Sequence, residues 1–209
     1  MGHQNADIDS VGSSIGLYRF AKMLKEDVHI VNNTKSMAIN GFIDTIKEQE
    51  EYKDVIIDKS QAISKTNSET LLIITDTHKK TFVEVPELLD KTENIVIIDH
   101  HRKSADFIEN ATLTFHETYA SSASELVTEI IEYGTNDIEL KQIEAEGLYA
   151  GIMIDTKNFT FKTGVRTFEA AAYLRKYGVD IIRVKKWFQS DLDSYNLIAD
   201  IVKKAEIIN

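Results

Sequence analysis

Carboxylates and histidines cluster where apolar segments of this sequence end. They are His3, Asp7 and Asp9 near the start, Asp76 after the run 71–75, and the triplet Asp99, His100 and His101 after the run 95–98. Oxygen and imidazole ligands from several strand ends can together hold divalent cations. The pattern therefore predicts a site for two metal ions. Such a site activates water for the cleavage of a phosphate ester or a similar bond.

Six residues are the predicted metal ligands. These are His3, Asp7, Asp9, Asp76, His100 and Asp155. Asp76 is the natural bridging ligand, because a carboxylate has two oxygens and can hold two cations. Asp155 ends the apolar run 148–154, where an unpaired carboxylate would be costly to bury. Ligands without sulfur favour Mn²⁺, with Mg²⁺ or Co²⁺ as alternatives, over structural zinc.

Four further residues are expected to serve the reaction. Asp99 is expected to orient the ligands without binding metal itself. A ligating histidine needs a hydrogen-bond acceptor on its second ring nitrogen, and a neighbouring carboxylate can supply it. His101 is expected to reach the substrate phosphate or the leaving group. Arg102 and His78 are expected to contact the substrate, Arg102 through a bidentate phosphate contact. Simpler alternatives remain open: Asp7 and Asp9 could cap a helix, Asp76 could form a turn, and Arg102 could form a surface ion pair.

The runs 71–75 and 95–98 are short, continuous and rich in isoleucine, which is typical of parallel strands covered on both faces. Alternation of such strands with helices predicts an α/β fold with a parallel sheet and flanking helices. In such sheets the functional crevice lies at the carboxyl ends of the strands, where Asp76 and Asp99 stand. Further strands are expected at 28–32, 55–57 and 112–116, and helices at 10–24 (capped by Ser10), 42–52, 82–90, 120–133, 139–154, 166–177, 180–189 and 194–207.

Composition narrows the range of partners. The chain has 209 residues, no cysteine and a formal net charge of −10, so neither a disulfide framework nor a thiolate metal site can form. Long nucleic acid is excluded as a partner, because its binding depends on clustered Lys and Arg. No apolar run approaches the roughly 20 residues of a membrane span, so no membrane contact by this chain is expected.

Four motifs together resemble those of the DHH phosphoesterase superfamily. They are the pattern of His3, Asp7 and Asp9, then Asp76, the Asp99–His100–His101 triplet, and Asp155. The surrounding sequence is similar to a narrower branch, the GdpP-type cyclic di-AMP phosphodiesterases of the DHH/DHHA1 family. That similarity lies in segments 76–79, 97–102, 119–122, 125–127, 150–152, 155–159 and 166–171, and it covers most of residues 1–190.

The resemblance implies a metal-dependent phosphodiesterase that hydrolyses cyclic di-AMP to linear pApA with a water activated by two metals. One Mn²⁺ would be held by His3, Asp7 and Asp76, and the other by Asp9, Asp76, His100 and Asp155. Asp99 and His101 would complete the catalytic shell.

The resemblance also implies a domain organisation. Residues 1–190 would be a DHH domain whose first strand is cut away, and 191–209 a connector helix toward a DHHA1 domain that the chain does not contain. Family members carry membrane helices upstream, so the domain would be cytoplasmic and the full-length protein anchored to the cell membrane. Without DHHA1 the isolated fragment is expected to be weakly active.

Alternative functions remain open at this point. One is a nanoRNA or pAp phosphatase of the same superfamily, which would cut short linear nucleotides instead of a cyclic dinucleotide. Another is a catalytically weak fragment that binds metal or nucleotide. A pyrophosphatase is disfavoured, because the chain lacks a rich cluster of Lys and Arg for so highly charged a substrate. A homodimer is left open.

Overall fold

The computed structural model describes residues 1–24, 26–33, 37–134, 139–189 and 192–205. Its strands are short and form two parallel sheets. Within these residues β1 (Ile30–Val31) pairs with β2 (Ile56–Ile57) in one small sheet. A second sheet has the order β3 (Leu72–Thr75), β4 (Ile95–Asp99) and β5 (Leu113–His116), again with parallel neighbours. The expected α/β class is therefore confirmed, and β5, the strand expected at 112–116, lies at the edge of this sheet.

The register of the larger sheet brings the site residues together. Thr75 of β3 pairs with Ile98 of β4, and the backbone N–H of Asp76 donates to the carbonyl of Ile98 at 2.9 Å. Asp99 in turn pairs with His116 of β5. The residues that follow β3 and β4 thus lie side by side at the carboxyl edge of the sheet, as the pattern of apolar runs predicts.

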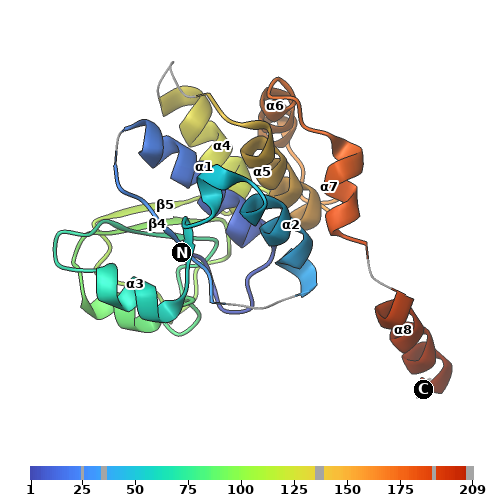
Figure 1. The fold of residues 1–209 in the computed structure, drawn as a ribbon, viewed down its shortest axis with the longest axis horizontal. Helices are drawn as coiled ribbons and strands as arrows, with labels where there is room; N and C mark the ends of the chain where they lie inside the picture. The colour runs from blue at the N-terminus through green and yellow to red at the C-terminus, as the bar shows by residue number, and fades with distance from the viewer. Residues whose placement is uncertain (25, 34–36, 135–138, 190–191, 206–209) are drawn as a thin grey trace.

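Most of the helices gather on one side of the strands, away from α3 (Lys59–Lys65) (Figure 1). The helix α1 (Ile8–Met23) packs along α5 (Gln142–Asp155) and against α4 (Ala123–Gly134). A Cβ added at Gly12 of α1 would lie 2.8 Å from the carbonyl carbon of Gly147 on α5. Only glycine permits so close an approach of two helix backbones. The remaining elements are α2 (Met37–Lys47), η1 (Glu50–Tyr52), α3 (Lys59–Lys65), η2 (Pro86–Asp90), α6 (Val165–Arg175), α7 (Ile181–Trp187) and α8 (Leu192–Lys204).

Several expected boundaries are wrong. The cap of α1 is Asp7, whose carboxylate accepts from the backbone N–H of Ser10, so Ser10 is not the cap. The helix expected at 42–52 begins earlier, ends at Lys47 and is followed by the separate turn η1. Of the helix expected at 82–90 only η2 forms, because Val83 and Val85 are buried in alternation and Val83 bridges to His3.

The later helices match the expected ones with shifted ends. α4 begins at Ala123 and not at residue 120, and α5 runs from Gln142 to Asp155 instead of 139–154. The helices expected at 166–177 and 180–189 are α6 and α7, which both end two residues earlier than expected. α8 begins at Leu192, while residue 207, the expected end of that helix, lies outside the described residues.

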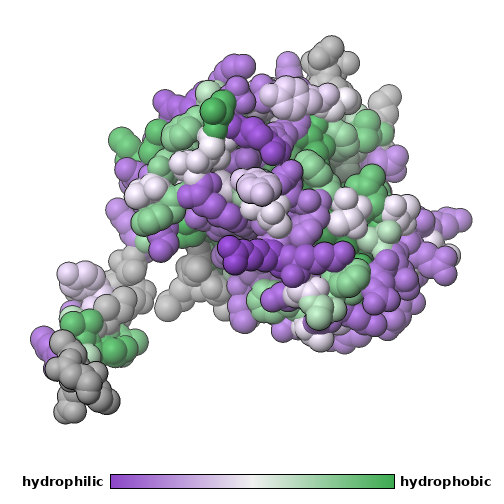
Figure 2. All heavy atoms as spheres, turned by 180° about the vertical axis from the view of Figure 1, so that it is seen from behind, coloured by the Kyte–Doolittle hydropathy of each residue, from purple (hydrophilic) through white to green (hydrophobic). Residues whose placement is uncertain are grey.

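The two ends of the chain differ in their surroundings. Met1 lies against β3, with its amino group 2.8 Å from the carbonyl of Ile73. α8 stands apart from the rest of the molecule (Figure 1), and Figure 2 shows apolar side chains on its surface. Leu197 and Val202 of this helix are exposed. In the described part of the chain no helix combines the length and apolar character needed to cross a membrane. The predicted cut first strand and connector helix stay predictions.

Candidate metal centre

Asp76 lies at the centre of the candidate site, directly after β3. Its φ of 62° is in the left-handed region, which turns the chain sharply at the end of the strand. Its Oδ2 lies 3.2 Å from Nε2 of His3, and its Oδ1 lies 3.2 Å from Nε2 of His100. Asp76 is buried. The two oxygens of one carboxylate therefore face two different imidazoles.

His3 and Asp7 form the first group around Asp76. Nε2 of His3 lies 3.9 Å from Oδ1 of Asp7. Nδ1 of the same ring lies 2.8 Å from the backbone carbonyl of Gln4. With its proton on Nδ1 donated to this carbonyl, the ring presents Nε2 as a ligand, which is the usual arrangement of a metal-binding histidine. Asp7 also caps α1, so the capping alternative is confirmed for this residue without turning its carboxylate away from His3.

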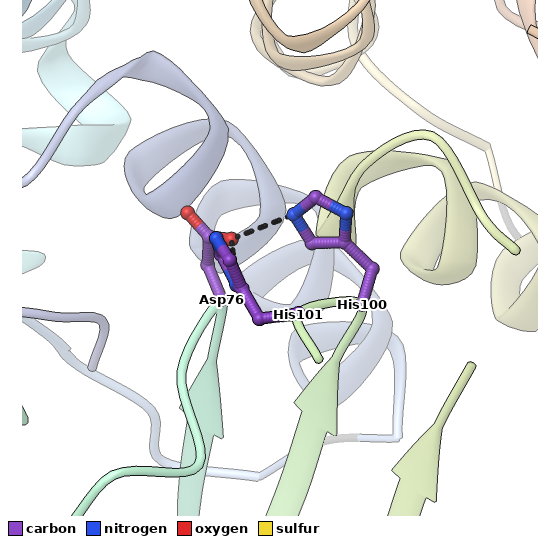
Figure 3. A group of neighbouring side chains, drawn as sticks. All are labelled: Asp76, His100 and His101. Carbon is purple, nitrogen blue, oxygen red and sulfur yellow. Dashed lines mark ion pairs between the residues drawn. The ribbon is translucent and has the colours of Figure 1, made fainter. Parts of the chain in front are cut away.

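His100, Asp155 and Asp9 form the second group. Nε2 of His100 lies 3.2 Å from Oδ2 of Asp155, the last residue of α5, and 3.8 Å from Oδ2 of Asp9 on α1. Figure 3 shows His100 and His101 beside Asp76 at the end of neighbouring strands, with the His100 ring directed at the Asp76 carboxylate. The segment before α1, two helices and two strand ends thus supply the six predicted ligands.

Asp9 is held by the first turn of a third helix. Its two carboxylate oxygens accept from the backbone N–H groups of Ala123 and Ser124 of α4, each at 2.8 Å, and the residue is fully buried. The positive end of the α4 dipole stabilises a carboxylate at this place. Asp9 lies in α1 and does not cap it, so the capping alternative is wrong for Asp9.

Asp99 is bound from several sides. Its Oδ1 accepts from the backbone N–H of His100 at 2.8 Å and lies 2.8 Å from Nδ1 of His101, while its Oδ2 contacts Nδ1 of His78. Nε2 of His78 accepts from the backbone N–H of Ser104 at 3.0 Å. These contacts suit the orienting role predicted for Asp99. They also engage both nitrogens of His78, whose predicted contact with substrate stays a prediction.

A cavity of about 910 Å³ opens beside the cluster. Its walls include His101 and Arg102, the residues predicted to meet the substrate, together with His78. The His101 side chain is half exposed, as a group that meets substrate requires. The walls also include Lys79, Tyr119 and Lys162, which are not among the predicted site residues.

The cluster carries an excess of buried negative charge. Burial, with the charges of Asp76 and Asp155, raises the pKa of Asp9 well above its ordinary value. Burial alone would lower the pKa of the two histidines, but the neighbouring carboxylates dominate and raise it to about 9 for His3 and about 10 for His100. The site therefore attracts positive charge, whether from protons or from metal ions.

The donor set fits divalent metal ions. Oδ1 of Asp76 and Nε2 of His100 are buried and have no hydrogen-bond partner among the described residues, although they face each other at 3.2 Å. Buried polar atoms without partners are costly unless something binds them. A cation between these atoms would satisfy both. The ligands are carboxylate oxygens and imidazole nitrogens, which suit Mn²⁺ and related ions.

A family model described as "DHH family, N-terminal domain" matches residues 1–152. The chain belongs to the DHH family. DHH phosphoesterases are metal-dependent, and the acidic and histidine groups of this site could hold metal.

Relatives of known name agree with this assignment. The chain is 41% identical over its whole length to the cyclic-di-AMP phosphodiesterase GdpP of Bacillus subtilis, and it spans 31% of that protein. It is 39% identical to the cyclic-di-AMP phosphodiesterase PdeA of Listeria monocytogenes, where 99% of the chain matches 32% of the relative. The chain thus spans about a third of the length of these curated relatives.

A solved structure shares the DHH fold. An exopolyphosphatase-related protein from Bacteroides fragilis superposes with a TM-score of 0.80 at 21% identity, covering 99% of this chain and 61% of that one. At this identity the likeness shows the fold alone.

The substitution Gly151→Ala tests how tightly the candidate metal centre is packed. A Cβ at this position of α5 would lie 2.6 Å from Oδ1 of Asp9 and would also collide with Ser124. We expect Gly151→Ala to displace Asp9 and lower metal affinity by roughly 10–100-fold, as changes behind metal ligands do. Isothermal titration with Mn²⁺ measures this. Gly164→Ala, whose Cβ would meet nothing within 4 Å, is the matched control. Equal affinities in the two variants would contradict the prediction.

Proposed function

We propose that this chain is the catalytic part of a phosphodiesterase that hydrolyses cyclic di-AMP to linear pApA. The observation that carries the proposal is the position of Asp76, whose two oxygens face separate groups of imidazole and carboxylate ligands. Such an arrangement suits two metal ions acting on one phosphate. The identity of 41% to a cyclic-di-AMP phosphodiesterase supports the choice of substrate.

Two divalent cations would occupy the site, and Mn²⁺ suits its mixed ligands best. In this proposal His3, Asp7 and Asp76 hold one ion, and Asp9, Asp76, His100 and Asp155 hold the other. When bound, such ions supply Lewis acidity and lower the pKa of water to near neutrality. The six ligands include four carboxylates, so two divalent cations neutralise them and allow an anionic substrate to approach.

The remaining residues hold the ligands in position or contact the substrate. Asp99 fixes the backbone after β4 and the His101 ring, and so holds the His100–His101 pair in place. His101 and Arg102 lie on the cavity wall, where they can hydrogen-bond phosphate oxygens. The cavity of about 910 Å³ is large enough for a dinucleotide.

The partner is therefore a small nucleotide, either cyclic or short and linear. The net charge of −10 disfavours long nucleic acid. In the full-length protein we propose that this domain is cytoplasmic, attached to a membrane anchor and followed by a DHHA1 domain. An assay for dimers by sedimentation tests the homodimer left open by the sequence.

Hydrolysis assays test the proposal directly. Cyclic di-AMP, pApA and pAp are incubated with Mn²⁺ and either this chain or the longer protein that includes the following domain, with Asp99→Ala as the inactive control. Formation of pApA from cyclic di-AMP by the longer protein, and not by the variant, supports the proposal. Cleavage of only the linear substrates would instead favour the nanoRNA or pAp phosphatase alternative.

Metal binding has a predicted signature in stability. Ligands that bind the folded state alone stabilise it by about 2.7 kcal/mol at 100 times Kd. For a chain of this size each kcal/mol raises Tm by about 2–4 °C. We therefore expect Mn²⁺ to raise Tm by roughly 5–10 °C in differential scanning fluorimetry. EDTA should reverse the rise. An unchanged Tm at millimolar Mn²⁺ would contradict the metal site.

A further inference from the structure

Lys162 reaches the candidate metal centre from a loop that the sequence motifs do not include. Its Nζ lies 2.9 Å from Nδ1 of His100, although much of the residue is exposed. It also lines the cavity beside Asp76 and His101. Within the described residues no carboxylate lies within 4.0 Å of Lys162, so its charge is not consumed by an ion pair.

The backbone of this loop has an unusual conformation. Between α5 and α6, the non-glycine residues Lys157, Asn158, Phe159 and Lys162 have φ between 47° and 61°. Left-handed conformations of this kind cost energy and persist only where the surroundings enforce them. Thr156 holds the turn at 157–161, because its hydroxyl accepts from the N–H of Phe159 at 2.9 Å and its carbonyl accepts from the N–H of Phe161 at 2.9 Å. The loop thus places Lys162 next to the site.

Lys162 cannot act as the hydrogen-bond acceptor that a metal-bound His100 needs on Nδ1. A histidine that binds metal through Nε2 carries its proton on Nδ1, and this N–H needs an acceptor. The Lys ammonium has three donors and no acceptor, so it cannot serve the bound ligand in this way. In contrast, an ammonium that has no carboxylate partner is suited to bind an anion in the cavity.

We propose that Lys162 binds a phosphate oxygen of the substrate in the cavity. The inference rests on the proposed function for the presence of a phosphodiester. Four carboxylates and two divalent cations sum to no net charge, so a further cation on the cavity wall adds to the attraction for a phosphodiester anion. Lys162 supplies a positive charge at the cavity wall, on the His100 side of Asp76.

Lys162→Gln and Lys162→Arg test the proposal, with Lys157→Gln as the matched control. Lys157 lies in the same loop and has the same left-handed backbone, but its Nζ lies over the Phe161 ring and it does not line this cavity. The readouts are inorganic phosphate binding to the Mn²⁺-loaded protein by calorimetry, Mn²⁺ affinity, and KM and kcat for cyclic di-AMP.

We expect Lys162→Gln to weaken phosphate binding and raise KM by about 10-fold or more, as the loss of a charged hydrogen bond does. Mn²⁺ affinity should remain, Lys162→Arg should restore binding, and Lys157→Gln should change it less than twofold. A parallel loss of Mn²⁺ affinity would show that Lys162 positions His100 and would overturn the proposal. Equal effects of Lys157→Gln would also overturn it. Phosphate binding is readable whichever phosphodiester is cleaved, so failure on cyclic di-AMP alone counts against the proposed function and not against Lys162.

Discussion

Asp76→Asn is expected to abolish hydrolysis and to weaken metal binding at both proposed positions. Asparagine keeps the size of the side chain and tolerates the left-handed φ of 62°, so the turn after β3 should survive. What it loses is the negative charge and one of the two oxygens that face His3 and His100. Metal ions contribute several kcal/mol to such reactions, so we expect a fall of about a thousandfold or more in kcat/KM.

Metal content measured by mass spectrometry separates this explanation from misfolding. The variant should retain its circular dichroism spectrum, bind fewer than two Mn²⁺ per chain and lose the rise of Tm on adding Mn²⁺. Asp90→Asn is the matched control, because Asp90 is exposed at the end of η2 and lies outside the ligand cluster. If Asp76→Asn binds two ions with unchanged affinity, Asp76 is not the bridging ligand.

The position of Asp76 also shows what local sequence patterns can predict. The runs 71–75 and 95–98 predict β3 and β4 because continuous apolar residues suit strands that are buried on both faces. Parallel pairing then brings the residues that follow the strands to one edge, so Asp76 and His100 could be placed together from the sequence. Each step depends on neighbouring residues and a general rule of sheet topology.

Local sequence patterns predicted the structure less well where it depends on contacts between residues far apart in the sequence. The helix α3 was not predicted, although Asp58 and Gln61 form a capping box at its start that the sequence signals. Residues 82–85 were expected to be helical, but Val83 and Val85 are buried in alternation and the chain bridges to His3. The approach of Lys162 to His100 depends on left-handed residues other than glycine, which no sequence pattern here indicates.

A buried ion pair between α1 and α5 was likewise beyond the sequence pattern. Nε of Arg19 lies 2.9 Å from both carboxylate oxygens of Glu144, which is fully buried. The Tyr52 hydroxyl donates to the same carboxylate at 2.6 Å, and Glu51 accepts from Arg19 at 2.9 Å. The two helices that this network joins also carry Asp9 and Asp155, so it helps to set the spacing of these two predicted metal ligands.

Glu144→Gln is therefore expected to be strongly destabilising. Removing the Glu144 charge leaves the buried Arg19 with Glu51, which is partly exposed, as its remaining ionic partner, at a cost of up to about 3–5 kcal/mol. Urea unfolding of the metal-free protein measures the change in free energy of unfolding. Glu48→Gln is the matched control, because Glu48 is an exposed glutamate. This substitution should change the free energy of unfolding by less than about 0.5 kcal/mol. A loss below about 1 kcal/mol for Glu144→Gln would contradict the prediction.

A double variant distinguishes the two ways in which this network could contribute. If the cost of Glu144→Gln comes from the buried Arg19 charge that has lost its Glu144 partner, then Arg19→Met combined with Glu144→Leu should recover much of the stability, because apolar residues can replace a buried ion pair. Mn²⁺ affinity need not recover with it. The pair fixes how α1 and α5 meet through specific hydrogen bonds, and apolar contacts tolerate small shifts between helices. Recovered stability with weakened Mn²⁺ binding would assign the Arg19–Glu144 pair to the geometry of the metal centre, and recovery of both would assign it to folding alone.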